Sequence, residues 1–315
     1  MILTSKTLRE ITKATITTII DNYSDTLLPS DEKVERPPLV RGALRMPPLL
    51  AEHGFSVLVE VWDDSKHHTI LMDFGASKIG VPYNVKVLEI DLEKVEAFVI
   101  SHGHHDHVGS ISEILYQLSK KPRPVVVHPD AFIPTRFRTL PEGKEIPIPC
   151  LEKGVIEQSG NEVIDGRSLV LTASDHILVL GEIPRTNDFE KVSGAYYREG
   201  EKICKDRIMD DKAIVINVKN KGLVIISGCA HAGIMNTIRY AQKLVGVDKL
   251  YCVMGGFHLV DSDEDKVKRT LKEMKLLDPE IIVPCHCTGI KVKQKFEKRF
   301  PRAFVWNSSG TRIHL

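Results

Sequence analysis

The feature that most constrains this chain is a run of side chains able to bind metal ions, His102-Gly103-His104-His105-Asp106-His107. The run directly follows the apolar, β-branched stretch 95–100, which predicts a buried strand. Residues two apart in an extended loop point the same way, so His102 and His104 can bind one ion while Asp106 and His107 face a second. Zinc, iron and manganese all accept imidazole and carboxylate ligands. The run therefore predicts two divalent metal ions, zinc foremost, with iron or manganese as alternatives.

Charge and hydropathy narrow the class of partner. The formal net charge of the 315 residues is only +1, which argues against a nucleic-acid binder that works through a basic surface. No stretch approaches the roughly 20 apolar residues of a membrane span, and the first residues lack the pattern of a secretory signal. We therefore expect a cytoplasmic protein with a small-molecule substrate and neither nucleic acid nor membrane as partner; the oligomeric state stays open.

The order of predicted elements indicates one α/β domain over residues 1–315. Strands are expected at 14–20, 55–62, 69–74, 124–127, 213–218, 223–227, 249–254, 280–284 and 303–306, and helices at 111–118, 234–245, 263–276 and 292–299. The proline-rich stretch 26–48 reads as irregular, and the loosely patterned stretch at about 129–210 as an insertion or lid. Two strand-rich halves that each carry helices suit an αββα sandwich of two mixed sheets with helices outside.

A family resemblance explains the metal-binding run. His-x-His-x-Asp-His after a strand resembles the signature loop of the metallo-β-lactamase superfamily. The resemblance implies that His102 and His104 hold one metal and that Asp106 and His107 hold the other, with His105 in a variable position. The diiron oxidoreductases of this superfamily carry glutamate where this chain has His104. The resemblance therefore favours the hydrolytic branch over electron transfer.

The same resemblance implies further ligands downstream. His286, in the phrase Pro-Cys-His-Cys-Thr-Gly, follows a predicted strand as the last ligand histidine of the superfamily does, and His231 opens a helix after the 223–227 strand. The chain departs from the pattern at the group that bridges the two metals. Asp211 stands where a histidine is usual, and Cys229 where the bridging aspartate is usual. Both remain candidates for that bridge, and a structural role is open for each.

Several other residues are candidates around the metals. His258, after Gly255-Gly256 at the end of a predicted strand, is a candidate for substrate contact or proton donation, and a core histidine is the alternative. Asp73 and His53 could orient metal-bound histidines, with turn or packing roles equally open. Arg185, Thr288 and Lys291 are candidates for binding the substrate, the two cations through its phosphate, although such cations more often simply face solvent.

Short phrases along the chain narrow the resemblance to a subgroup. They are Asp-Asn-Tyr at 21–23, Ala-Glu-His-Gly-Phe-Ser at 51–56, Gly-Glu-Ile-Pro-Arg at 181–185, Ser-Gly-Cys-Ala-His-Ala-Gly at 227–233, Gly-Gly-Phe-His-Leu at 255–259 and Pro-Cys-His-Cys-Thr-Gly at 284–289. Together they resemble the 7,8-dihydropterin-6-methyl-4-(β-D-ribofuranosyl)aminobenzene 5′-phosphate synthase-like proteins, over about residues 16–310. That subgroup name denotes a transferase, whereas the metal motif is typical of hydrolysis.

Three functions therefore stay open. The first is a hydrolase that uses a hydroxide held by two metals on a small phosphorylated ester, with Asp106 orienting the water. The second is a transferase of pterin-cofactor biosynthesis that joins a dihydropterin to a ribofuranosylaminobenzene phosphate. The third is a metal-binding or redox-sensing protein without turnover, for which Cys229, Cys285 and Cys287 beside histidines are the reason.

Overall fold

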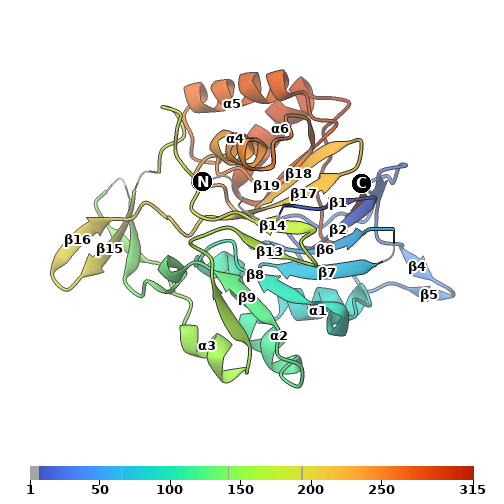
Figure 1. Cartoon of the computed structure of the whole chain (residues 1–315), viewed down its shortest axis with the longest axis horizontal. Helices are drawn as coiled ribbons and strands as arrows, with labels where there is room; N and C mark the ends of the chain where they lie inside the picture. Colours follow the sequence, from blue (N-terminus) through green and yellow to red (C-terminus); the bar gives the residue numbers. More distant parts are fainter. Residues whose placement is uncertain (1–6, 65, 141, 193) are drawn as a thin grey trace.

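The computed structural model describes residues 7–64, 66–140, 142–192 and 194–315. Two large mixed sheets pack face to face, with helices on both outer faces (Figure 1). This arrangement confirms the predicted αββα sandwich. In the described part of the chain, no helix is long and apolar enough to cross a membrane.

The first large sheet carries the strand that leads into the histidine run. Its strand order is β12-β9-β8-β7-β6-β2-β21-β3. Its members are β2 (Lys13–Ile20), β3 (Val34–Glu35), β6 (Ser56–Trp62), β7 (His67–Met72), β8 (Ala97–Val99), β9 (Pro124–Val127), β12 (Glu162–Asp165) and β21 (Arg312–His314). Strands β7, β8, β9 and β12 run parallel, so their carboxyl ends meet at one edge.

The second large sheet supplies the other loops of the site. Its strand order is β13-β14-β17-β18-β19-β20, with β1 paired to β17. Its members are β1 (Glu10–Ile11), β13 (Val170–Thr172), β14 (Ile177–Val179), β17 (Ala213–Val218), β18 (Gly222–Ser227), β19 (Leu250–Gly256) and β20 (Ile281–Cys285). The last three strands are parallel neighbours and end together.

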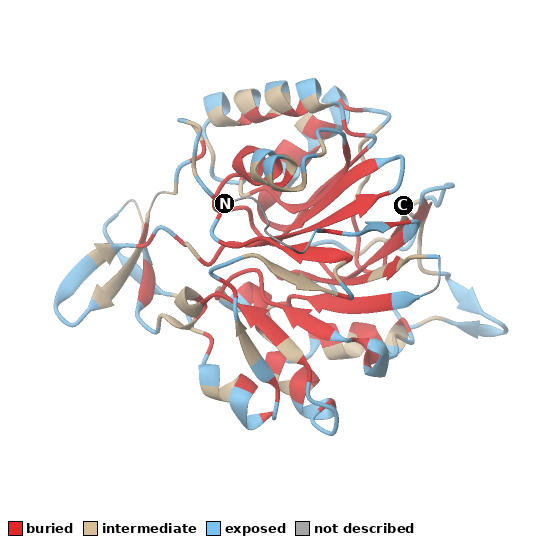
Figure 2. Cartoon of the chain, viewed as in Figure 1, coloured by how far each residue is buried: buried red, intermediate tan, exposed pale blue. Residues whose placement is uncertain are grey.

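Three apolar layers hold the sandwich together. The central layer lies between the sheets and includes Ile16, Val59, Ile214 and Met254, all fully buried. The two outer layers lie beneath the helices, and Figure 2 shows buried strands under helices whose outer faces are exposed. The helices are α1 (Gly80–Val87), α2 (Ile111–Gln117) and α3 (Lys153–Gln158) on the first sheet, and α4 (Ile234–Val245), α5 (Glu264–Leu277) and α6 (Ile290–Arg299) on the second. Short 3₁₀ turns occur at Leu92–Lys94, His105–His107, Pro129–Phe132 and His286–Thr288.

The stretch predicted as an insertion or lid divides between core and periphery. Strands β12, β13 and β14 belong to the two large sheets. A separate small sheet, β11-β10-β15-β16, projects from the body (Figure 1). Its strands are β10 (Arg136–Thr139), β11 (Glu145–Pro147), β15 (Ala195–Glu199) and β16 (Lys202–Lys205). The small sheet is therefore the part of residues 129–210 to which the lid prediction applies. That this sheet closes over the site stays a prediction.

Three local predictions differ from the structure. Residues 303–306 form no strand, because only an isolated bridge joins Phe304 to Ile282. Helix α1 was not expected, since its sequence Gly-Val-Pro-Tyr-Asn-Val-Lys-Val contains a proline and three β-branched valines. The stretch 26–48 is mostly irregular as expected, but β4 (Val40–Arg41) and β5 (Leu44–Arg45) pair as a small exposed hairpin.

A buried ion network ties the small sheet to the histidine run. Arg136 of β10 makes two hydrogen bonds to Asp210, at 2.6 and 2.9 Å, and its Nε lies 2.7 Å from Asp206 Oδ2. Asp210 Oδ2 also accepts a hydrogen bond from the amide of Gly103, at 2.8 Å. All three charged side chains are nearly inaccessible to solvent. The network fixes the loop that carries His102 and His104.

Arg136→Met should therefore destabilise the protein strongly, by about 3–5 kcal/mol, because it leaves two buried carboxylates without their counter-ion. Urea unfolding of the metal-free protein measures the effect. Arg138→Met is the matched control on the same strand, since Arg138 pairs with Asp261 at 3.7 Å on the exposed surface. Equal stability of the two variants would contradict the anchoring role of Arg136.

Candidate metal centre

The predicted metal ligands, apart from Asp211 just before β17, lie on loops that leave the carboxyl ends of strands. The histidine run follows β8, Cys229 and His231 follow β18, His258 follows β19, and His286 follows β20. Because parallel strands end at one edge, and the two sheets face each other, these loops meet. The structure thus brings together residues that are up to 184 positions apart in the chain.

The first group of donor atoms centres on His102. Its Nε2 lies 3.0 Å from His104 Nδ1 and 3.2 Å from His231 Nε2. Burial lowers the pKa of His102 and His231 well below the ordinary value, and that of His104 to about 3. The three imidazoles are therefore neutral at physiological pH, which is the form that binds metal ions.

The second group contains Asp106, His107 and His286. Asp106 Oδ2 lies 3.2 Å from His286 Nε2 and 3.9 Å from His107 Nε2. Burial opposes the charge on Asp106, but His107 and His286 outweigh it and hold the pKa of this carboxyl far below its ordinary value. Burial likewise opposes the charge on His107, but Asp73 and Asp106 raise its pKa to about 9. This half of the site therefore stabilises positive charge.

Cys229 lies between the two groups. Its Sγ is 3.1 Å from His107 Nε2 and lies within 4.8 Å of donor atoms of His102 and His231 on one side, and of Asp106 and His286 on the other. A thiolate there could contact an ion in either group. Among the described residues Asp211 belongs to neither group. It is instead buried beneath the His231 loop, where its Oδ2 accepts a hydrogen bond from the amide of Ala232 at 2.8 Å.

Buried hydrogen bonds set the orientation of the imidazoles. Asp73 accepts from the amide and hydroxyl of Ser101 and from His107 Nδ1, each at 2.7 Å. The Ser101 hydroxyl in turn accepts from His102 Nδ1 at 3.0 Å. His286 Nδ1 donates to Asn22 Oδ1 at 3.0 Å. Because each Nδ1 donates outward, each Nε2 faces the centre and is the atom left to bind a metal ion.

The donor set fits divalent cations. His286 Nε2 faces a carboxylate oxygen of Asp106, and His102 Nε2 faces the nitrogens of two other imidazoles. Each of these contacts needs a proton or a metal cation between the two facing atoms. Imidazole, carboxylate and thiol ligands together suit zinc and other first-row transition metals better than magnesium or calcium. These residues could therefore hold a transition-metal ion in either group.

The backbone around the site is strained. Positive φ angles occur at four non-glycine residues of the site loops: Asp73 (63°), Ala230 (51°), His258 (45°) and His286 (46°). Side chains other than glycine rarely adopt this conformation, and it concentrates at functional sites. In these loops it turns the side chains of Asp73, His258 and His286 away from the strand direction and toward the centre.

A cavity of about 710 Å³ opens above the donor atoms. His104, Asp106, Cys229 and His231 line its floor, together with His53 and His258. His53 Nδ1 accepts from Asn22 Nδ2 at 2.9 Å, and its Nε2 lies 3.5 Å from Asp106 Oδ2. The far walls come from the small sheet and from α5. The cavity is large enough for a small organic substrate.

The three predicted substrate contacts lie outside this cavity. Arg185 donates to the carbonyl of Ile208 at 3.1 Å, and Lys291 is exposed on α6. Thr288 is buried, and its hydroxyl accepts from the amide of Phe257 at 3.0 Å. The cavity wall instead contains Lys266 of α5, which the sequence did not single out. Its position depends on how α5 is rotated about its axis, and the sequence pattern left that rotation undetermined.

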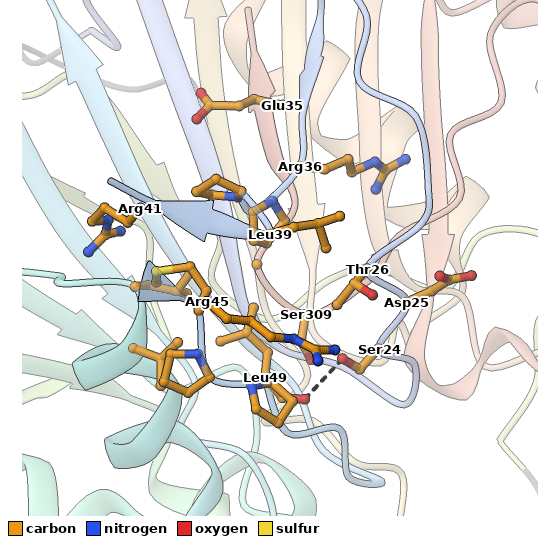
Figure 3. Close-up of a pocket in the computed structure, with 18 of the residues that line it drawn as sticks. Ser24, Asp25, Thr26, Glu35, Arg36, Leu39, Arg41, Arg45, Leu49 and Ser309 are labelled. Atoms are coloured by element: carbon orange, nitrogen blue, oxygen red, sulfur yellow. Dashed lines mark hydrogen bonds between the residues drawn. The ribbon is translucent and has the colours of Figure 1, made fainter. Parts of the chain in front are cut away.

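A second cavity of about 560 Å³ lies beneath the irregular stretch after β2 (Figure 3). Arg36, Arg41 and Arg45 line it along with several prolines. The Ser24 hydroxyl donates to the carbonyl of Leu49 at 3.0 Å across one side. Arg36 and Arg41 already have partners, in the Thr311 hydroxyl and Glu89 respectively. The cavity contains none of the metal donors described above.

Comparisons with known proteins agree with this geometry. The family model of the metallo-beta-lactamase superfamily matches residues 51–186. The 7,8-dihydropterin-6-methyl-4-(beta-D-ribofuranosyl)-aminobenzene-5′-phosphate synthase of Methanocaldococcus jannaschii is 32% identical over 280 residues, which cover 84% of this chain and 91% of that protein. An uncharacterized protein of the same organism is 29% identical over 271 residues, with 84% and 94% covered.

A solved structure shows the same fold. The crystal structure of Tm1679, named a metal-dependent hydrolase of the beta-lactamase superfamily, matches with a TM-score of 0.72 at 24% identity, over 95% of this chain and 98% of Tm1679. Residues 51–186 thus match the metallo-beta-lactamase superfamily model, and the chain as a whole has the metallo-β-lactamase fold. The chain belongs to the family of the M. jannaschii synthase, which confirms the predicted subgroup.

Proposed function

We propose that this protein is a metal-dependent hydrolase of small phosphorylated esters that binds two divalent ions, zinc foremost. The observation that carries the proposal is the pair of donor groups around Cys229 at the floor of a cavity of about 710 Å³. His102, His104 and His231 would hold one ion, and Asp106, His107 and His286 the other, with Cys229 between them. Two bound ions would supply a nucleophilic water at neutral pH and neutralise charge on the attacking and leaving oxygens.

Two further histidines are placed for proton transfer. His258 lines the cavity, its ring centroid is 4.2 Å from that of His231, and its Nδ1 is buried without a hydrogen-bond partner among the described residues. We assign it proton donation to the leaving group. His53 contacts Asp106 from the solvent side and is held by Asn22. Its role is to position Asp106 and to exchange protons with the cavity.

Lys266 is the cation best placed to bind the acidic group of the substrate. It lines the same cavity as His258 and Cys287 and is only half-buried. Of the three other cations of the wall, Arg269 is paired with Asp188, Arg138 is paired with Asp261, and Lys191 is exposed. Lys266 forms no ion pair within 4.0 Å in the part of the chain that the structure describes. Its ammonium group is therefore available to a phosphate.

A transferase of pterin-cofactor biosynthesis is the second candidate. The observation that favours it is the 32% identity to the M. jannaschii synthase along 91% of that protein. The same cavity, metals and cation would then serve two substrates, the dihydropterin and the ribofuranosylaminobenzene phosphate. A requirement for both substrates separates the transferase from the hydrolase.

Asp106→Asn should lose one of the two metal ions and lower turnover by about two orders of magnitude or more, because an amide is a far weaker ligand than a carboxylate. Metal content by mass spectrometry and turnover on phosphodiester, phosphomonoester, ester and lactone substrates measure both effects. His105→Ala is the matched control, since His105 is exposed on the same turn.

Full activity of Asp106→Asn would sink the two-metal hydrolase. No cleavage of any of these substrates by metal-loaded wild-type protein would instead favour the transferase. In that case product should form only when the dihydropterin and the aminobenzene phosphate are both present.

Lys266→Met should raise the KM for phosphorylated substrates by about tenfold or more, since it removes a charged hydrogen bond, while kcat changes little. The KM for an uncharged ester should stay the same. Steady-state kinetics on the two substrate types makes the comparison. Lys291→Met, an exposed lysine outside the cavity, is the control. A KM unchanged for the phosphorylated substrate would contradict the assignment of Lys266.

A further inference from the structure

Two buried thiols meet at the edge of the metal site. Cys229 Sγ and Cys287 Sγ are 3.3 Å apart, and only 2% and 5% of the two residues is exposed. A disulfide requires an S–S separation of about 2.05 Å, so closure needs a side-chain movement of just over an ångström. The two residues come from different loops, 58 positions apart in the chain.

Glycine residues between these two loops let the loops approach each other. Cys229 follows β18 and Cys287 follows β20, and the strand between them, β19, ends in Gly255 and Gly256. A Cβ atom at Gly256 would lie 2.6 Å from Cys287 Sγ and 3.2 Å from the Cα of Cys229. Any larger residue at 256 would therefore separate the thiols. The same Cβ atom would lie 2.5 Å from the carbonyl oxygen of Gly228, so the loop that carries Cys229 also needs glycine at 256 to pack this closely.

Small oxidants can reach the pair. Both cysteines line the cavity of about 710 Å³ above the metal donors. The other two buried cysteines, Cys252 and Cys285, do not line it. Cys252 and Cys285 therefore serve as internal comparisons for reactivity that depends on the cavity.

We propose that Cys229 and Cys287 form an oxidisable pair, which a peroxide converts into a disulfide that removes Cys229 from the metal donors. In the first step, one thiol sulfur attacks a peroxide oxygen, the O–O bond breaks, and a sulfenic acid and one water form. In the second step, the other thiol displaces hydroxide from the sulfenic acid, which leaves as a second water. Two electrons and two protons thus pass from the thiols to hydrogen peroxide.

Oxidation would affect metal binding because of where Cys229 lies. Its Sγ is a member of three close donor groups: one with Asp106, His107 and His286, one with His102 and His231, and one with His258 and Cys287. A disulfide sulfur carries no thiolate charge and is a poor ligand for zinc. Oxidation would therefore weaken metal binding on both sides at once. This inference requires metal binding but no particular reaction, so it stands or falls separately from the proposed hydrolase.

The test treats zinc-loaded protein with hydrogen peroxide and follows intact mass, free thiols and zinc release to a chromogenic chelator. We expect a mass lower by two hydrogen atoms, a Cys229–Cys287 cross-link in peptide maps, and a zinc dissociation constant raised about tenfold or more. A thiol reductant should reverse all three changes.

Cys287→Ser should form no cross-link, and its zinc affinity should be the same before and after peroxide treatment. Cys252→Ser is the matched control and should behave as the wild type. Gly256→Ala is a second test of the proposal, because it should prevent the cross-link although both thiols are still present. Peroxide treatment that leaves Cys229 and Cys287 as thiols, or a cross-link that leaves zinc affinity unchanged, would overturn the proposal.

Discussion

The hydrogen bonds that Asp73 accepts are the interaction on which the site depends. One buried carboxylate takes the amide and the hydroxyl of Ser101 and Nδ1 of His107, all at 2.7 Å. Through Ser101 it also fixes His102. The loop after β8 is thereby joined to the end of β7, and two imidazoles are turned with their Nε2 atoms toward the centre. Without this carboxylate the loop would have three buried donors unsatisfied.

The rest of the fold brings the remaining donors to that loop. Parallel strands β18, β19 and β20 end at the same edge, and each contributes a histidine or cysteine just beyond its last residue. The positive φ angles at His258 and His286 cost conformational free energy, which the packing of the sandwich offsets. A rigid core therefore holds polar, strained loops, and it is the loops that supply the chemistry.

The sequence predicted the features that depend on residues close together in the chain. It left open those that depend on how distant loops pack against each other. The run at 102–107 could be recognised because its ligands lie within one turn of each other, and the histidines after β18 and β20 because a strand pattern precedes them. Whether Asp211 or Cys229 stands between the donor groups could not be decided, since both lie near strand ends. The contact of Asp211 with Ala232 became visible only in the structure.

The same limit applies to the walls of the cavity. Arg185 and Lys291 were predicted from nearby motifs, but neither side chain lines the cavity, whereas Lys266 does. Helical periodicity predicts which face of α5 is apolar, but it does not show which polar residue at its start faces another loop. The lid prediction over 129–210 likewise merged core strands with the small sheet, because short strands separated by prolines and charges look alike in sequence.

Anomalous X-ray diffraction at the zinc absorption edge, from zinc-loaded crystals, tests whether Cys229 lies between two metal ions as we propose. We expect two anomalous peaks. One should lie about 2.0–2.3 Å from nitrogens of His102, His104 and His231, the other at the same range from donors of Asp106, His107 and His286. Cys229 Sγ should lie between them. A single peak, or a Cys229 side chain turned away from both peaks, would contradict a two-metal site around Cys229.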